Sequence, residues 1–146
     1  MRILNTMEVK IKKTDKLAVI PAYASIGASG LDLSAIDLII INPGERTLLR
    51  TGISIELPQG YGALVMGRSG NTIKRGLFVA LGLIDSDYRG EIGVMAFNAT
   101  DKKMIIQQGD RIGQLVIIPT PQILLNETSE LSDTERGNGG FGSTGI

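Results

Sequence analysis

The sequence from Thr47 to Met66 reads Thr-Leu-Leu-Arg-Thr-Gly-Ile-Ser-Ile-Glu-Leu-Pro-Gln-Gly-Tyr-Gly-Ala-Leu-Val-Met. Its first part, up to Leu57, follows the two-residue period of a half-buried strand. The next step, Pro58-Gln59-Gly60, is a turn signal, because proline fixes φ and glycine tolerates positive φ. A second strand is expected from Tyr61 to Met66. The stretch therefore predicts one strand from Thr47 to Leu57, a tight turn and a second strand.

The same pattern extends outward in both directions along the chain. Turn signals occur at Asn42-Pro43-Gly44 and at Gln107-Gln108-Gly109-Asp110. About eight to ten short strands with turns every ~8–12 residues predict a sandwich, barrel or jelly roll. A turn or two of helix is expected only near residues 69–75. The further strands are expected at Val9–Ile11, Leu38–Ile41, Leu77–Leu81, Glu91–Asn98 and Arg111–Ile118.

The composition of the chain limits which catalytic groups and metal ligands it can use. The 146 residues favour one domain, and the sequence contains neither Cys nor His. Thiolate sites and the commonest general base are therefore excluded, which leaves carboxylates, Lys or Tyr for acid–base work and a hard, oxygen-ligated ion such as Mg²⁺ as the expected metal. A formal net charge of zero gives no indication of nucleic-acid binding. With no apolar run near ~20 residues and no signal-peptide core at the start, a soluble intracellular protein is expected, cytoplasmic if bacterial and in the host cell if viral or phage.

The end of the chain has a different character. From residue 126 it is polar, and Arg136 to Gly145 reads Arg-Gly-Asn-Gly-Gly-Phe-Gly-Ser-Thr-Gly. So many glycines lose too much backbone entropy to become ordered alone, so we expect a core at residues 1–125 and a flexible arm at 126–146. The arm formally contains G-x-G-x-x-G, but it lacks the strand and helix that a dinucleotide fold requires. Its backbone N–H groups, hydroxyls and Arg136 could cradle phosphate; the alternative is a disordered terminus.

Four other segments permit either a functional or a plain structural interpretation. Leu83-Ile84-Asp85-Ser86-Asp87-Tyr88-Arg89-Gly90-Glu91 holds Asp85 at a strand end, or is only a charged hairpin. Gly67-Arg68-Ser69-Gly70 is a phosphate-binding turn or merely a turn. Asp32, between two leucines, faces away from them on a strand or is a solvated edge residue. Gly109 to Leu115 is typical of a turn that enters a buried strand.

These five segments, in this order, resemble the five motifs of the trimeric dUTPase family, and they span nearly the whole chain. The family resemblance implies an all-β jelly-roll or distorted-barrel subunit of a homotrimer, with a glycine-rich C-terminal arm that closes a neighbour's active site. It implies hydrolysis of dUTP to dUMP and pyrophosphate by in-line water attack on the α-phosphate, with Mg²⁺ bound to the substrate. By the same resemblance, the activity is expected to limit uracil incorporation into DNA and to supply dUMP for dTMP synthesis. The matching segments are Ala28–Leu33, Gly67–Gly70, Gly82–Glu91, Gly109–Leu115 and Arg136–Gly145.

The resemblance also implies roles for individual residues. Asp85 orients and deprotonates the attacking water, Tyr88 packs on the deoxyribose and excludes a 2′-hydroxyl, and Asp32 reaches the metal through water. The hairpin of Val79, Ala80, Leu81 and Gly82 contacts uracil through its backbone, and Phe141 stacks on the base. The implied phosphate-binding residues are Arg68, Ser69, Gly70, Gln114, Arg136, Gly140, Ser143 and Thr144.

Two departures and two alternatives accompany this resemblance. Asn71-Thr72 stands where many members have Leu-Ala, and Val79 to Leu81 offer no polar side chain to the base. A dCTP deaminase shares the fold, but it needs a carboxylate in the strand at residues 92–98, and this chain has none there. The second alternative is a non-catalytic nucleotide-binding or regulatory module, and the intact Asp85 and complete arm argue against it.

Overall fold

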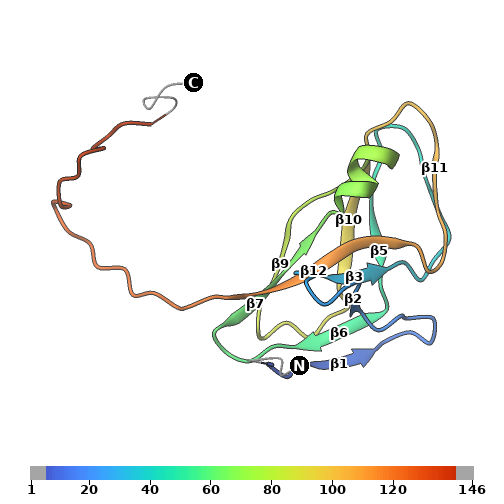
Figure 1. Ribbon diagram of the computed structural model, residues 1–146, viewed down its shortest axis with the longest axis horizontal. Coiled ribbons are helices and arrows are strands. Elements are labelled where there is room, and N and C mark those ends of the chain that lie inside the picture. The colour runs from blue at the N-terminus through green and yellow to red at the C-terminus, as the bar shows by residue number, and fades with distance from the viewer. Residues whose placement is uncertain (1–5, 141–146) are drawn as a thin grey trace.

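The computed structural model describes residues 6–140, and its regular structure is almost entirely β (Figure 1). One short helical segment of π type, η1 (Asn71–Arg75), interrupts the strands. The strands are β1 (Lys10–Lys13), β2 (Ala22–Tyr23), β3 (Leu31–Ser34), β4 (Ile39–Ile41), β5 (Arg46–Arg50), β6 (Ile53–Glu56), β7 (Tyr61–Met66), β8 (Leu77–Val79), β9 (Gly82–Ile84), β10 (Gly93–Asn98), β11 (Met104–Ile106) and β12 (Arg111–Pro119).

These strands form four antiparallel sheets with a jelly-roll fold. The largest has the order β2-β3-β12-β7-β9, and a second has the order β5-β10-β8. The pairs β1-β6 and β11-β4 complete the set, and the described residues contain no closed barrel. Consecutive strands β8 and β9 belong to different sheets, so the chain crosses between sheets at residues 80–81. The predicted all-β fold is confirmed.

The core lies between the sheets and consists of aliphatic side chains at alternate strand positions. In β10, Val94 and Ala96 are buried, whereas Met95 and Phe97 between and beyond them are exposed. This alternation follows from the pleat, which sends successive side chains to opposite faces. The largest fully buried apolar residues include Leu33, Ile36, Ile41, Leu49, Ile53, Leu77, Ile92, Ile106 and Ile112.

The predicted turns are confirmed, but the single strand expected from Thr47 to Leu57 is wrong. Gly52 has φ of +66°, a left-handed conformation that breaks the strand into β5 and β6. A Cβ at Gly52 would lie 3.0 Å from the Cβ atoms of both Asp15 and Ala18, so glycine also makes room for a close approach. This break and the very short strands, such as Ala22–Tyr23, explain why residues 6–140 contain twelve strands instead of the expected eight to ten.

The expected helical turn near residues 69–75 is confirmed as η1. It ends at Arg75 and is capped by Gly76, whose φ of +68° is left-handed and whose N–H donates to the carbonyl oxygens of Asn71 and Thr72. Within residues 6–140 the structure has no helix with the length and apolar character needed to span a bilayer.

Beyond β12 the chain leaves the body and runs away from it (Figure 1). Residues 121–138 are exposed throughout, and no strand is found from residue 120 to residue 140.

Candidate active site

Three of the predicted motifs meet at neighbouring strands of the largest sheet. Asp32 of β3 is directly opposite Gln114 of β12, and Gln114 is opposite Met66 of β7. Because β7 ends at Met66, the turn that carries Arg68 follows immediately. These segments line one hollow, which we call the Arg68 hollow: Ala24, Ala28, Ser29, Gly30, Asp32, Arg68, Ser69, Gly70, Asn71 and Gln114.

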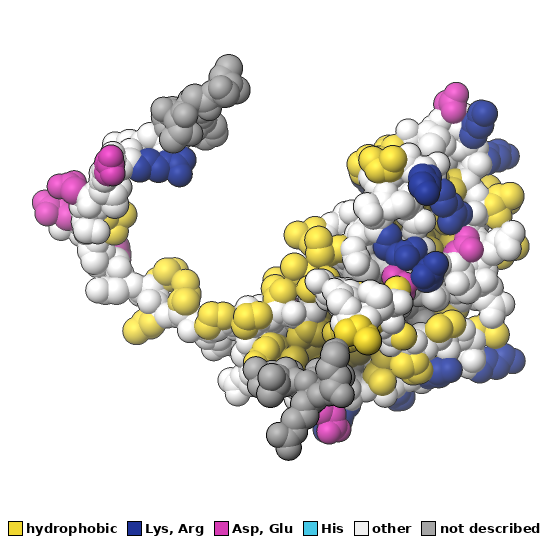
Figure 2. Space-filling model, viewed as in Figure 1, with side chains coloured by type: hydrophobic (Ala, Val, Ile, Leu, Met, Phe, Trp, Pro, Cys, Tyr) yellow, Lys and Arg dark blue, Asp and Glu magenta, His cyan; other side chains and the backbone are white. Residues whose placement is uncertain are grey.

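Asp32 is the electrostatic centre of the Arg68 hollow. Its Oδ1 lies 2.9 Å from Nε of Arg68, and its Oδ2 lies 3.2 Å from Nη1 of Arg111. Only 15% of the Asp32 side chain is exposed. The Arg68 pair uses Nε, so the two terminal nitrogens of Arg68 are not needed to hold Asp32. Two guanidinium groups against one carboxylate leave an excess positive charge beside the hollow, contributed by Arg111, which contacts Asp32 but does not line the hollow. Figure 2 shows several Lys and Arg side chains on the part of the surface below and beside η1.

Gln114 is held by packing as well as by hydrogen bonding. Its Nε2 donates a hydrogen bond of 2.8 Å to the carbonyl oxygen of Gly67. A Cβ placed on Gly30 would overlap the Gln114 side chain and lie 3.1 Å from Gln114 Cβ, so the first motif needs glycine there. The backbone at Arg68 is also fixed by η1, since Thr72 N donates a 3.0 Å hydrogen bond to Arg68 O.

The departure at Asn71-Thr72 has a structural explanation. Asn71 is buried and its Nδ2 donates to Arg111 O at 2.7 Å, while Thr72 Oγ1 donates to Leu77 O at 3.3 Å. These bonds fasten η1 to β12 and to the start of β8. Sequence reasoning missed Asn71 and Arg111 as parts of the site; the only signal for Arg111 was its place inside the fourth motif.

Asp85 lies elsewhere. It follows β9 directly, as predicted, and its carbonyl accepts a 3.2 Å hydrogen bond from Tyr88 N that closes the turn. The carboxylate is exposed and opens on a separate hollow, the Asp85 hollow. That hollow is lined by the hairpin, the turn before β7 and the chain that leaves β12, including Gln59, Gly60, Tyr61, Gly62, Leu83, Asp85, Ser86, Thr120 and Gln122.

The pairing of β7 with β9 determines how far Asp85 lies from Arg68. Ala63 is opposite Ile84 and Val65 is opposite Gly82, so β9 ends near the beginning of β7. Asp85 therefore lies at the Tyr61 end of β7, whereas Arg68 follows the Met66 end. A strand of this length spans roughly 17–20 Å. One chain thus does not bring Asp85 to Arg68.

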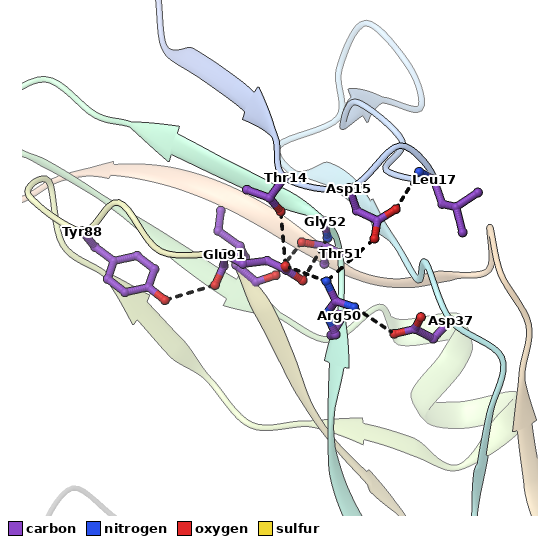
Figure 3. A network of polar contacts seen from close by, with 10 residues as sticks. Thr14, Asp15, Leu17, Asp37, Arg50, Thr51, Gly52, Tyr88 and Glu91 are labelled. Atoms are coloured by element: carbon purple, nitrogen blue, oxygen red, sulfur yellow. Dashed lines mark hydrogen bonds and ion pairs between the residues drawn. The ribbon is translucent and has the colours of Figure 1, made fainter.

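Tyr88 is 44% exposed, and its hydroxyl donates a 3.1 Å hydrogen bond to Glu91 O (Figure 3). Its ring lies across Gly90, where any Cβ would collide with the ring carbon and hydroxyl. Arg89 closes the hairpin by donating from Nη1 to the carbonyls of Ser86 and Tyr88, at 2.7 and 3.0 Å. Gly90 and Glu91 were not identified from sequence as functional, although both lie within the quoted third motif.

The hairpin expected to contact uracil joins two sheets. Val79 pairs with Ala96 of β10, and Gly82 pairs with Val65 of β7. Ala80 N already donates to Met95 O at 2.9 Å, so the Ala80 carbonyl and the backbone of exposed Leu81 are the groups available to a base.

The arm residues divide between described and undescribed parts of the chain. Arg136 and Gly140 are described, and Arg136 Nε donates to Gly139 O at 2.8 Å. This segment lies on the arm, away from the body in Figure 1, and the structure does not bring it to either hollow. Phe141, Ser143 and Thr144 lie outside the described residues.

The carboxylates of the described residues are not arranged to hold a metal ion by themselves. Within residues 6–140 no three Asp or Glu side chains gather as a metal site. Asp32 is the carboxylate of the Arg68 hollow, and both of its oxygens face guanidinium groups.

Comparison with known proteins gives a consistent result. The dUTPase family model matches residues 6–145. The chain is 50% identical over 143 residues to the deoxyuridine 5'-triphosphate nucleotidohydrolase of Hydrogenobaculum sp., covering 96% of this chain and 99% of that one.

Solved structures are similar as well. A mutant dUTPase of Staphylococcus bacteriophage 80alpha, solved with dUpNHpp, gives a TM-score of 0.89 at 27% identity and covers 97% of this chain and 100% of that chain. A mutant dUTPase from phage phi11 of S. aureus, described for its coordination of a structural Mg(II) ion, gives 0.83 at 22% identity, covering 87% and 100%.

Proposed function

The chain belongs to the dUTPase family and hydrolyses dUTP to dUMP and pyrophosphate, and from this premise we propose that each working site is built from more than one copy of the chain. The observation that carries the proposal is the placement of Arg68 and Asp85 at opposite ends of β7. In-line attack requires a base at the α-phosphate and cations on the same triphosphate. Where one chain contributes Arg68 to a bound triphosphate, a second copy of the chain contributes Asp85.

Asp85 is the general base in this proposal. It accepts a proton from water while the water oxygen bonds to the α-phosphorus. The bond from that phosphorus to the oxygen bridging to the β-phosphorus breaks, dUMP remains and pyrophosphate leaves. A carboxylate suits the task in a sequence without His, and its place directly after β9 fixes its backbone while leaving the side chain open to solvent.

The Arg68 hollow binds the triphosphate. Asp32 holds Arg68 through Nε and so presents its two terminal nitrogens, the paired donors that suit phosphate oxygens. Ser69, Gly70 and Gln114 complete the phosphate contacts. Because Asp32 holds Arg68 before the nucleotide arrives, little reorganisation is needed when negative charge develops on the leaving group.

Mg²⁺ enters this proposal bound to dUTP. A triphosphate supplies oxygen ligands of its own, so the protein needs to add at most a water-mediated contact, which we assign to Asp32. The ion neutralises charge on the phosphates when bound. This assignment agrees with a donor set that has one carboxylate in the hollow and cations around it.

A second copy also explains an exposed apolar face. Leu48, Phe78, Met95 and Phe97 are cross-strand neighbours on the sheet β5-β10-β8, and each side chain is between 42 and 58% exposed. Contiguous exposed apolar side chains on a sheet mark an interaction surface. We propose that copies of the chain cover this face in a homotrimer, and that the arm at residues 126–146 reaches from the core to close a neighbour's site.

The nucleoside is recognised near the Asp85 hairpin in the same proposal. Tyr88 forms a flat wall against the deoxyribose, because a ring fixed by its hydroxyl and by Gly90 leaves no room for a 2′-hydroxyl. The backbone from Val79 to Gly82 contacts uracil, and Phe141 stacks on the base. From the arm, Arg136, Gly140, Ser143 and Thr144 contact phosphates.

Pyrophosphate release from dUTP, dTTP, UTP and dCTP tests the proposal, together with the mass of the particle in solution. We expect hydrolysis of dUTP far above the other three and a mass three times that of one chain. A monomer with full activity would contradict the shared site. Ammonia release from dCTP would contradict the hydrolytic reaction itself.

A further inference from the structure

The Asp85 hairpin is held by a carboxylate that does not line the Asp85 hollow. Glu91 lies at the end of the hairpin, and its side chain turns toward the junction of β5 and β6 (Figure 3). Its Oε2 accepts hydrogen bonds from Thr14 Oγ1 at 3.2 Å and from Arg50 Nη2 at 3.1 Å. Its Oε1 accepts a hydrogen bond from Gly52 N at 3.1 Å. Glu91 thus connects the hairpin to two distant segments of the chain.

The junction that receives Glu91 is rigid. Gly52 is left-handed and enclosed, and its carbonyl accepts from Thr14 N at 2.8 Å. Next to it, Ile92 N donates to Ile53 O at 2.8 Å, so the backbone directly after Glu91 is also fastened to the junction. Contacts with Thr14, with buried Gly52 and with Ile53 of β6 therefore determine where Glu91 lies.

Arg50 is shared among several carboxylates. Besides Glu91, it lies 3.9 Å from Asp15 and 3.9 Å from Asp37. The hydrogen bond and charge of Glu91 raise the pKa of Arg50. Partial burial raises the pKa of Glu91, but the hydrogen bonds from Arg50 and Gly52 outweigh burial and keep that pKa below its ordinary value. The pair therefore stays ionised at neutral pH.

The other end of this connection is Tyr88. Its hydroxyl donates to the backbone carbonyl of Glu91, and its ring rests on Gly90, the residue before Glu91. A shift of the Glu91 backbone therefore moves the acceptor of the Tyr88 hydroxyl and the surface beneath the ring. Tyr88 N in turn closes the turn at Asp85 O, so the same shift reaches the catalytic carboxylate.

We propose that Glu91, held by Arg50, is a positioning residue for deoxyribose selection and for catalysis. It acts through Tyr88 and Asp85 and does not touch the nucleotide. This inference rests on the proposed functions of Tyr88 and Asp85. Anchoring by Glu91 sets the ring against the sugar, and a weaker anchor widens the space at the 2′ position.

The test compares Glu91→Gln and Arg50→Lys with Glu56→Gln. Glutamine keeps an oxygen for Gly52 N but loses the charge that binds Arg50, and lysine keeps the Arg50 charge but loses its paired donors. Glu56 is a matched control, because it forms a similar 3.0 Å pair with Lys10 across β1 and β6. It feels the charge of hairpin residue Arg89 but forms no hydrogen bond with the hairpin within the described residues, so it separates loss of a nearby charge from loss of the anchor. The measurements are kcat and KM for dUTP and for UTP, with Tyr88→Ala as the reference for a missing wall.

A second measurement follows the ring itself. The chain has three tyrosines, so 3-fluorotyrosine labelling gives three ¹⁹F resonances, and Tyr88→Phe identifies the one of interest. A displaced ring changes this resonance without any substrate present.

We expect Glu91→Gln to lower kcat for dUTP about tenfold to a hundredfold, since a misplacement near 1 Å costs about 10²-fold. The UTP/dUTP ratio of kcat/KM should rise toward that of Tyr88→Ala, and the Tyr88 resonance should move. Arg50→Lys should change the UTP/dUTP ratio and the Tyr88 resonance in the same direction as Glu91→Gln. Glu56→Gln should change neither the ratio nor the resonance.

An unchanged ratio and an unchanged resonance in Glu91→Gln, whatever happens to its melting temperature, would overturn the inference. The failure of the underlying assignment looks different. If Tyr88→Ala itself leaves the UTP/dUTP ratio unchanged, Tyr88 is not the wall, and the fluorine resonance alone then decides whether Glu91 positions the ring.

Discussion

The Arg68 hollow and the Asp85 hairpin, at opposite ends of β7, are built in different ways. In the hollow, side chains from β3, β12 and the turn after β7 hold one another, with Asp32 between Arg68 and Arg111 and Gln114 bonded to Gly67. In the hairpin, the Asp85 carboxylate is exposed and the fixed groups are its neighbours in the backbone. The candidate side chains of the Arg68 hollow bond to one another. The Asp85 hairpin is instead fixed by hydrogen bonds of the residues next to Asp85.

The difference agrees with the roles that we propose for the two regions. Binding a triphosphate requires several cationic and N–H donors in fixed positions, which neighbouring strands provide. Activating water requires one carboxylate that solvent can reach. Substitutions in the hollow should therefore affect mainly KM, and substitutions in the hairpin mainly kcat.

Asp85→Asn should give the largest effect. Loss of general-base help costs about 10²–10⁴-fold in kcat, with nucleotide binding nearly intact, because the Arg68 hollow is unchanged. Single-turnover hydrolysis and nucleotide titration measure the two quantities. Asp87→Asn, two residues away in the same hairpin, is the control and should retain most activity. An Asp85→Asn enzyme with more than about a tenth of wild-type kcat would remove Asp85 from the mechanism.

Asp32→Asn should give an intermediate effect, and it should change KM more than kcat. Arg68 loses the partner that fixes its Nε, so KM for dUTP should rise about tenfold at saturating Mg²⁺, equivalent to about 1.4 kcal/mol, with a smaller change in kcat. Steady-state kinetics at several Mg²⁺ concentrations measures both. Asp101→Asn, at an exposed turn, is the control. If KM stays constant at saturating Mg²⁺ and only the Mg²⁺ requirement changes, Asp32 acts on the metal and not on Arg68.

The smallest expected effect is the loss of folding stability in Glu91→Gln, which should depend on pH. The pKa of Glu91 is lowered in the folded protein, so its contribution to stability is present above the ordinary glutamate pKa and is lost as the pH falls through the lowered value. Wild type should exceed Glu91→Gln in stability by up to about 1 kcal/mol at neutral pH, the scale of a partly exposed ion pair. Melting curves from pH 7 downward should converge in acid. A constant gap would show that ionisation of Glu91 does not stabilise the fold.

Much of the fold could be predicted because its signals are local. Pro58-Gln59-Gly60 and Asn42-Pro43-Gly44 marked turns, and the apolar pair Leu83-Ile84 placed Asp85 at a strand end. The break at Gly52 could not be predicted in this way. Thr51-Gly52-Ile53 keeps the alternation of a strand, and only the tertiary contacts of Gly52 reveal the left-handed turn.

The motifs nominated candidate site residues, but they did not indicate how those residues are arranged. The motifs identified Asp32, Arg68, Gln114 and Asp85, yet no local pattern indicates that the first three share a hollow and the fourth does not. That separation depends on the register between β7 and β9. Contacts such as Arg111–Asp32 join residues 79 positions apart, so sequence spacing could not reveal them.

The central claim, that Asp85 and Arg68 of one working site come from different chains, can be tested by mixing subunits. Asp85→Asn and Arg68→Gln chains are unfolded, combined equally and refolded. In a closed three-fold ring every mixed trimer has one site with both residues intact, and random assembly makes about three-quarters of trimers mixed, so about a quarter of all sites should recover.

The decisive control is a chain with both substitutions, refolded with an equal amount of wild type. If the site is shared, this mixture also recovers about a quarter of its sites, because two neighbouring chains must both be wild type. If Asp85 and Arg68 act within one chain, the first mixture recovers none and the second about half. Equal recovery in the two mixtures is the result that this account predicts, and zero against one half would contradict it.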